Sequence, residues 1–361
     1  MAERRAHTVD RYIARDFLLV FVVVLLIIVT LLQSLDLMNE ADAVLAAEGA
    51  GAAQVLRYIG WRAPQLADRF GPFVGLLAAL ITFARLAQSS EITALRAAGA
   101  SRLRIIAPMM AVGGAIALTH FAFHELVVVE ANARLERWRA QDYAVSSAAE
   151  AQPIADIRLT DGRMILRAAS MQRVGDDDSS VWRLENLRAY EPEGGAMSAL
   201  HARVAVHDGT GWRIEGGQAF DAETQRWREA APDEWADGPP PDQIVAAALD
   251  PDQADLAELA RASRAADGLR GAARLETALL HRFTAPAASI LMPLLAAIAG
   301  FGLHRSHSLL PRIAAGIGLG FAYFVFDNLM VVMGRLDTVP AIAAALAAPI
   351  IFLGVGLSLR K

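Results

Sequence analysis

Residues 17–35 read FLLVFVVVLLIIVTLLQSL, an apolar run of 19 positions without a charged side chain. A helix of about 20 apolar residues is long enough to cross the hydrocarbon core of a bilayer. Four arginines precede the run, as in a signal peptide, but the apolar core of a signal peptide has only about 7 to 15 residues. The sequence therefore predicts an uncleaved transmembrane helix.

Five further apolar runs follow, at residues 70–84, 105–123, 283–303, 313–333 and 339–359. The run at 70–84 is short, so its helix is expected to extend back toward Pro64, with Arg69 and Arg85 reaching the head groups. The chain is 55% hydrophobic and 20% charged, with a mean hydropathy of +0.33, which is high for a soluble domain. The predicted fold class is an α-helical membrane protein with six transmembrane helices in two groups of three.

The segment between the two groups changes from helical to strand periodicity. Alternating runs lie at residues 157–159, 164–167 and 204–206. Turn pairs separate such runs, namely Asp161-Gly162, Gly194-Gly195, Asp208-Gly209 and Gly216-Gly217. This pattern predicts an inserted β-rich domain resembling a jelly roll. Three consecutive prolines mark residues 232–241 as a linker, and an amphipathic helix is expected to lead into the fourth span.

The predicted domain boundaries follow from these patterns. Residues 1–129 hold the first three spans and a short cytoplasmic helix near 89–99. Residues 130–245 form the β-rich domain, residues 246–280 form the amphipathic helix, and residues 281–361 hold the last three spans.

Charge is unevenly distributed and indicates the orientation. Residues 141–240 contain 18 acidic residues and 10 arginines, a net charge of −8, which leaves +3 on the rest of a chain of net charge −5. The basic short loops carry Arg96, Arg102, Arg104, Arg305, Arg312, Arg360 and Lys361. By the positive-inside rule these loops and both termini are cytoplasmic, and the inserted domain is periplasmic in the inner membrane of a bacterium.

Composition also excludes several functions. The chain has no cysteine, so disulfides and thiol catalysis are excluded. Its only lysine is Lys361, so a phosphate-binding G-x-x-x-x-G-K-[ST] loop cannot form. We therefore expect a non-enzymatic chain that binds no cofactor, with any ATP and Mg²⁺ held by a partner ATPase. The acidic balance argues against nucleic acid as a partner.

The short helix predicted between the second and third spans is the most informative stretch, SSEITALRAAG at residues 89–99. Ser90 is a favourable N-cap, Glu91 suits the first turn, and Gly99 is a natural stop. One interpretation is a connector lying on the membrane. The other is a coupling helix that docks on a cytosolic ATPase and presents Glu91 to a basic partner. The candidate coupling residues are Glu91, Leu95, Arg96 and Gly99.

Polar residues within the spans allow further hypotheses. His120 and His124 lie four residues apart with Glu125 beside them, which suits a metal site, but the order is not H-E-x-x-H and the position suits head-group contacts. We predict no metal here. Asp327 lies deep in the fifth span, where a charge costs about 2.5 to 3.5 kcal/mol, so it is expected to be protonated or paired, with Asn328 or with a partner helix.

Two glycines in the fifth span, Gly316 and Gly320, form a small-x-x-x-small pair that lets helices approach closely. Such a pair suits either static packing within the chain or a moving lateral gate. Both interpretations stay open at this point.

Several motifs resemble those of one family: VDRYI at residues 9–13, SEITALRAAG at 90–99, HELV at 124–127, ARVAVHDG at 202–209 with WRI at 212–214, and HRFTAP at 281–286. In this order they resemble the LptF/LptG family of lipopolysaccharide export permeases, over essentially the whole chain. DRY at 10–12 and FVFD at 324–327 are closer to the LptG branch.

The resemblance implies a permease subunit of an ATP-driven ABC transporter, which extracts lipopolysaccharide from the inner membrane and passes it to a periplasmic bridge toward the outer membrane. It implies four partners: a paralogous permease, a cytoplasmic ABC ATPase dimer, the periplasmic bridge protein and lipopolysaccharide itself. It also implies a lateral gate between the first span of one permease and the fifth span of the other.

One stretch departs from the family pattern. Members resembling LptG carry lysines near the periplasmic end of the first span, whereas residues 33–40 here read QSLDLMNE, without a basic residue. The arginines nearest on that side are Arg57, Arg62, Arg69, Arg134, Arg137 and Arg139. We take Arg62, Arg134, Arg137 and Arg139 as candidate contacts for a phosphorylated head group, with interfacial membrane anchoring as the alternative.

Three other functions fit parts of this pattern. A lipoprotein-release ABC permease would have one span before its inserted domain and three after it, which fits the order of elements less well. A membrane metallopeptidase would use His120 and His124, and metal analysis would test it. A structural anchor would need fewer spans and no docking helix.

Overall fold

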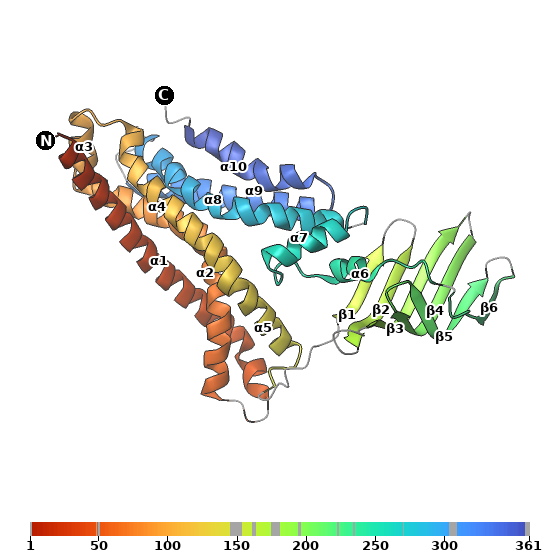
Figure 1. The fold of residues 1–361 in the computed structure, drawn as a ribbon. Coiled ribbons are helices and arrows are strands. Elements are labelled where there is room, and N and C mark those ends of the chain that lie inside the picture. The colour runs from red at the N-terminus through yellow and green to blue at the C-terminus, as the bar shows by residue number, and fades with distance from the viewer. Residues whose placement is uncertain are drawn as a thin grey trace. The chain divides into compact units, whose positions relative to one another are not determined.

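The computed structural model describes residues 2–47, 49, 51–144, 154–160, 164–174, 181–193, 196–221, 224–233, 235–269, 271–302 and 309–357 (Figure 1). The chain divides into two compact units. The first, here the membrane unit, comprises residues 1–147, 280–334 and 338–361. The second, the β unit, comprises residues 148–279 and 335–337.

Long apolar helices make up the membrane unit. They are α1 (Ala2–Ala46), α2 (Ala52–Gln88), α4 (Arg102–Phe123), α8 (Ala272–Gly302), α9 (Leu309–Arg335) and α10 (Ala341–Leu357). A π-helical turn, η1 (His124–Val128), joins α4 to α5 (Val129–Arg139). Five described segments are long and apolar enough to cross a membrane, and α10 is a shorter apolar helix. This confirms a helical membrane protein, while the count of six spans stays a prediction. As predicted, α2 starts well before Pro64.

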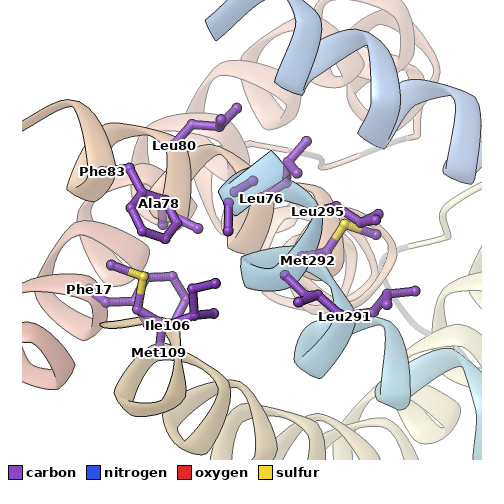
Figure 2. Packing of buried hydrophobic residues seen from close by; sticks show 14 of the residues in the cluster. Phe17, Leu76, Ala78, Leu80, Phe83, Ile106, Met109, Leu291, Met292 and Leu295 are labelled. Carbon is purple, nitrogen blue, oxygen red and sulfur yellow. The ribbon is translucent and has the colours of Figure 1, made fainter. Parts of the chain in front are cut away.

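Side chains from both groups of helices form one core in the membrane unit. Figure 2 shows Phe17 of α1, residues of α2 and α4, and Leu291, Met292 and Leu295 of α8 packed together. The backbones also approach closely, because a Cβ on Gly113 of α4 would lie 2.5 Å from the carbonyl oxygen of Ser289 in α8. Other apolar side chains face outward, as expected of helices that contact lipid: Leu26 is 62% and Leu118 77% exposed.

The β unit contains a six-stranded antiparallel sheet in the order β1-β2-β3-β4-β5-β6. Its strands are β1 (Ile154–Thr160), β2 (Ile165–Val174), β3 (Val181–Glu193), β4 (Ala196–His207), β5 (Trp212–Asp221) and β6 (Arg226–Glu229). The inserted β domain is thus confirmed. The described strands form a single meander, and the predicted jelly roll is not confirmed. Strand periodicity locates strands, whereas the order of strands in a sheet depends on which neighbours pair.

The predicted turns have mixed outcomes. Asp208-Gly209 joins β4 to β5, and hydrogen bonds from the hydroxyl and N–H of Thr210 lower the pKa of Asp208 to about 2. Gly216-Gly217 lies within β5 and is not a turn. The pairs Asp161-Gly162 and Gly194-Gly195 lie outside the described residues.

The stretch predicted as a linker packs onto the sheet. The indole N–H of Trp212 donates to the carbonyl of Pro239 at 2.8 Å, and the ring of Trp235 lies 5.3 Å from that of Trp212. Both indoles are buried, at 1% and 7% exposure. The prolines suggested a linker. Their spacing could not show that a tryptophan between them anchors the segment to the sheet.

The predicted helix over 246–280 is interrupted. Helix α6 (Pro241–Ala248) ends within the first residues of this range, α7 (Leu256–Ala265) follows, and α8 starts only at Ala272. The break after α7 contains Gly268 and Gly271, both with positive φ, which a continuous helix cannot accommodate.

Candidate functional sites in the membrane unit

The predicted short helix is present as α3 (Glu91–Ala97). Ser90 precedes it, as predicted, but with φ 58° and without a side-chain capping bond, so the prediction of a serine cap is wrong. The neighbouring Ser89 hydroxyl instead donates to Glu91 Oε1 at 2.9 Å. The hydroxyl of Tyr12 in α1 lies 3.5 Å from the same oxygen. The carboxylate of Glu91 is therefore held by hydroxyl groups, and no cation among the described residues neutralises it.

The end of α3 is a Schellman motif. The N–H of Ala100 donates to the carbonyl of Leu95 and the N–H of Gly99 to that of Arg96, both at 3.0 Å. Gly99 has φ +87°, a conformation that glycine adopts without strain. The prediction that Gly99 ends the helix is confirmed.

One face of α3 is anchored and the other is free. Ile92, Leu95 and Ala100 pack against the core of the membrane unit. The exposed residues of α3 and its C-terminal turn are Thr93, Ala94, Arg96, Ala97, Ala98 and Gly99. Leu95, predicted as a docking residue, thus seats the helix, whereas Glu91 and Arg96 remain accessible.

Two ion pairs lie at the same end of the membrane unit, here the α3 end. Arg85 of α2 pairs with Asp16 of α1 at 2.9 Å, and Arg104 of α4 with Asp10 of α1 at 3.2 Å. Both arginine side chains are more than half exposed, so each pair contributes little to stability. Their geometry nevertheless connects α1 to the two helices that flank α3.

At the opposite end, here the α5 end, acidic residues of α1 hold arginines from other helices. Arg62 of α2 forms a fork with Asp36, with Nη2 2.8 Å from Oδ1 and Nε 3.0 Å from Oδ2. The hydroxyl of Tyr58 donates to the same carboxylate at 2.5 Å. The acidic QSLDLMNE stretch therefore binds arginine within the chain.

The other three candidate arginines also have carboxylate partners. Arg139 lies 3.5 Å from Glu40 and 3.1 Å from Glu136. Arg134 donates to Glu130 at 2.5 Å, and Arg137 lies 3.9 Å from the same carboxylate. All four arginines proposed as head-group contacts are thus already engaged within the chain.

Arg57 differs from these four arginines. Its guanidinium carbon lies 4.5 Å from the ring centre of Trp61 and 4.9 Å from that of Trp138, and the two rings are perpendicular. The arginine is exposed whereas Trp138 is 2% exposed. No acidic side chain of the described residues lies within ion-pair distance of Arg57. The Arg-x-x-x-Trp spacing on one helix was the sequence signal for this contact.

The polar residues within the spans are paired with one another. His120 and His124 both contact Oδ1 of Asp68 in α2, each at 2.9 Å. Asp327 of α9 pairs with His281 of α8 at 3.2 Å. Asn328 instead donates to the carbonyl of Phe324, so of the two predicted options Asp327 is paired with another helix and not with Asn328. No group of three metal-binding side chains suited to an ion is present in the described part of the chain.

The predicted glycine pair lies in α9. Gly316 and Gly320 are both buried. Gly320 faces the side chain of Leu76 in α2, so its small size serves packing within this chain. Glycine spacing alone did not identify which helix it contacts.

Comparisons with known proteins agree with this architecture. The family described as "Lipopolysaccharide export system permease LptF/LptG" matches residues 11–361. The chain is 24% identical over 377 aligned positions to the lipopolysaccharide export system permease protein LptG of Escherichia coli K12, and the alignment covers 98% of each chain. The LptG protein of E. coli O6:H1 (strain CFT073) is similar to the same extent. With its multiple membrane helices and inserted β unit, the chain belongs to the LptF/LptG family of lipopolysaccharide export permeases.

Proposed function

We propose that this chain is an LptG-type permease subunit of the inner membrane, and that α3 docks on a separate ATPase whose hydrolysis of ATP drives lipopolysaccharide extraction. Since its single lysine excludes a P-loop, conformational work must enter through contact with another subunit. The observation that carries this proposal is the arrangement of α3. Its apolar face is seated on the core, and its Glu91 carboxylate has no cationic partner among the described residues.

The seating of α3 explains how docking would move the membrane helices. A short helix held by Ile92, Leu95 and a Schellman turn transmits force to the core better than a flexible loop. The ion pairs Arg85–Asp16 and Arg104–Asp10 lie at the same end and join α1, α2 and α4. A push on α3 would therefore reach α1, which the family's lateral gate involves.

We infer that the α3 end is cytoplasmic and that the β unit is periplasmic. The basic residues Arg96, Arg102 and Arg104 near α3 support this orientation. A second permease, an ATPase dimer and a periplasmic bridge protein would complete the assembly, as the family implies.

We further propose that Arg57 contacts a phosphate of the lipid head group. The arginines that sequence reasoning favoured are neutralised by Asp36, Glu40, Glu130 and Glu136, whereas Arg57 is exposed and held by two indole rings. Stacking restricts the guanidinium without occupying its N–H groups, which then remain available for a phosphate.

Changes at Glu91 test the docking proposal. Loss of one partner of a desolvated interfacial charge pair costs about 2 to 5 kcal/mol, which weakens binding by more than tenfold. We expect Glu91→Ala to reduce ATPase co-purification and export, and Glu91→Lys to reduce them further. Glu130→Ala changes an exposed glutamate at the α5 end and is the matched control. Normal ATPase content with Glu91→Lys would contradict the proposal.

A further inference from the structure

Two histidines of the membrane unit contact the same carboxylate oxygen. Oδ1 of Asp68 lies 2.9 Å from His120 Nε2 and 2.9 Å from His124 Nδ1. The three side chains are between 13% and 23% exposed. They join α2 to the point where α4 changes into the π-helical turn η1, and π-helical turns are frequent at functional sites.

Hydrogen-bond chemistry restricts the protonation states of this group. With Asp68 ionised, its oxygen can only accept, so both facing ring nitrogens carry hydrogen. The opposite nitrogens, His120 Nδ1 and His124 Nε2, are buried and have no hydrogen-bond partner among the described residues. With both rings neutral the group has a charge of −1, and one further proton on either ring makes it neutral.

Most of the other charged groups nearby are paired elsewhere, but Arg69, which follows Asp68 on α2, is exposed and forms no ion pair among the described residues. Glu125, next to His124, pairs with Arg282 of α8 at 2.6 Å, and His281 pairs with Asp327 of α9. On α1, α2 and α5, several ionisable side chains toward this end pair with one another: Asp36 with Arg62, Glu40 with Arg139, and Glu130 with Arg134 and Arg137. Arg57 of α2 instead stacks on Trp61 and Trp138. Among the described residues, Asp68 forms ion pairs with the two histidines only.

We propose that Asp68, His120 and His124 form a proton-binding site that locks α2 to the junction of α4 and η1. An uncompensated charge inside a membrane helix bundle is costly, and one additional proton on either ring would cancel the charge of Asp68. Without that proton, the negative charge of Asp68 between α2 and α4 is not neutralised. With a second additional proton, the group has a net positive charge. Because the site links α2 to α4, the two helices that flank α3 in the sequence, we expect proton loading to make the transport cycle depend on pH.

Histidine NMR tests the site without measuring transport. The chain has eight histidines, and in the assembled complex in nanodiscs the ring signals of His120 and His124 are assigned by their loss in His120→Asn and His124→Asn. Because the two rings share one carboxylate, we expect removal of either to shift the titration midpoint of the other by about one pH unit or more. Asp68→Asn is expected to shift both midpoints. Midpoints that do not respond to these changes would overturn the inference.

Export measured against pH tests the consequence, and this readout alone rests on the proposed function. We expect the dependence of export between about pH 6 and about pH 8 to be lost in Asp68→Asn and kept in Asp327→Asn, which removes a different carboxylate–histidine pair. An unchanged pH profile in Asp68→Asn would overturn the regulatory role. If the unmodified complex exported no lipopolysaccharide at any pH but its two histidine rings titrated in a coupled way, the proposed function would be contradicted and the proton site supported.

Discussion

Gly320 of α9 lies directly against Leu76 of α2, so that a Cβ at position 320 would stand 3.1 Å from Leu76 Cγ and 3.2 Å from its Cδ1. Leu76 Cδ2 would lie closer still to this Cβ, and Leu76 is completely buried in the core of the membrane unit (Figure 2). Two helices far apart in the sequence therefore meet at a position that only glycine fits.

Gly320→Ala is expected to destabilise the membrane unit by about 1 to 3 kcal/mol, the usual cost of overpacking a core. Thermal unfolding of the purified complex measures it. Gly318→Ala is the matched control, because a Cβ at Gly318 meets no atom within 4 Å. The double variant Gly320→Ala, Leu76→Ala should lose less stability than the sum of the losses of the two single variants. Equal effects of the two single glycine changes would contradict this packing.

Hydropathy predicted the long apolar helices, because lipid imposes this one simple requirement on a segment that crosses it. The short helix α3 was also predictable, since Glu91 in its first turn and Gly99 at its end are local signals. Sheet topology and the packing of Trp235 were not, because both depend on contacts between distant residues. The arginines show the same limit: each was visible in the sequence, but the carboxylate that holds it was not.

The orientation can be checked with single cysteines, because the chain has none of its own. We expect Ser101→Cys, next to α3, to be protected from an impermeant thiol reagent in intact spheroplasts. Glu215→Cys, at an exposed position of β5, should react. Membrane permeabilisation should make Ser101→Cys reactive, which controls for burial. The opposite labelling pattern would refute the proposed topology.

The head-group contact can be measured by photo-crosslinking to lipopolysaccharide. A charge-assisted hydrogen bond contributes about 1.5 to 3 kcal/mol, so Arg57→Gln is expected to weaken binding by about tenfold or more. Arg57→Lys keeps the charge but loses the planar fork and should be intermediate.

Arg137→Gln is the control for Arg57, because Arg137 is exposed but lies beside Glu130. It should leave crosslinking nearly unchanged, and ATPase content should be normal in all three variants. A loss with Arg137→Gln and none with Arg57→Gln would favour the arginines of α5 and refute the assignment to Arg57.

The pair between Glu125 of η1 and Arg282 of α8 connects the two groups of helices. Its atoms are 2.6 Å apart and the side chains are only 15% and 8% exposed. Removing one member leaves the other charge buried without its main partner, which typically costs about 3 to 5 kcal/mol. Removing both leaves no such charge. We therefore expect Glu125→Gln and Arg282→Gln to destabilise the complex strongly, and the double variant to be more stable than the sum of the single effects predicts.

The exposed pair of Arg134 and Glu130 on α5 is the comparison for this cycle, because both side chains are more than half exposed. Such a pair has a coupling energy of only about 0.3 to 0.5 kcal/mol. Thermal unfolding of both sets of variants gives the two coupling energies. A coupling at Glu125 and Arg282 no larger than that on α5 would mean that the contact does not hold η1 to α8. A large coupling would mean that any movement of α8 away from η1 during transport must first separate this ion pair.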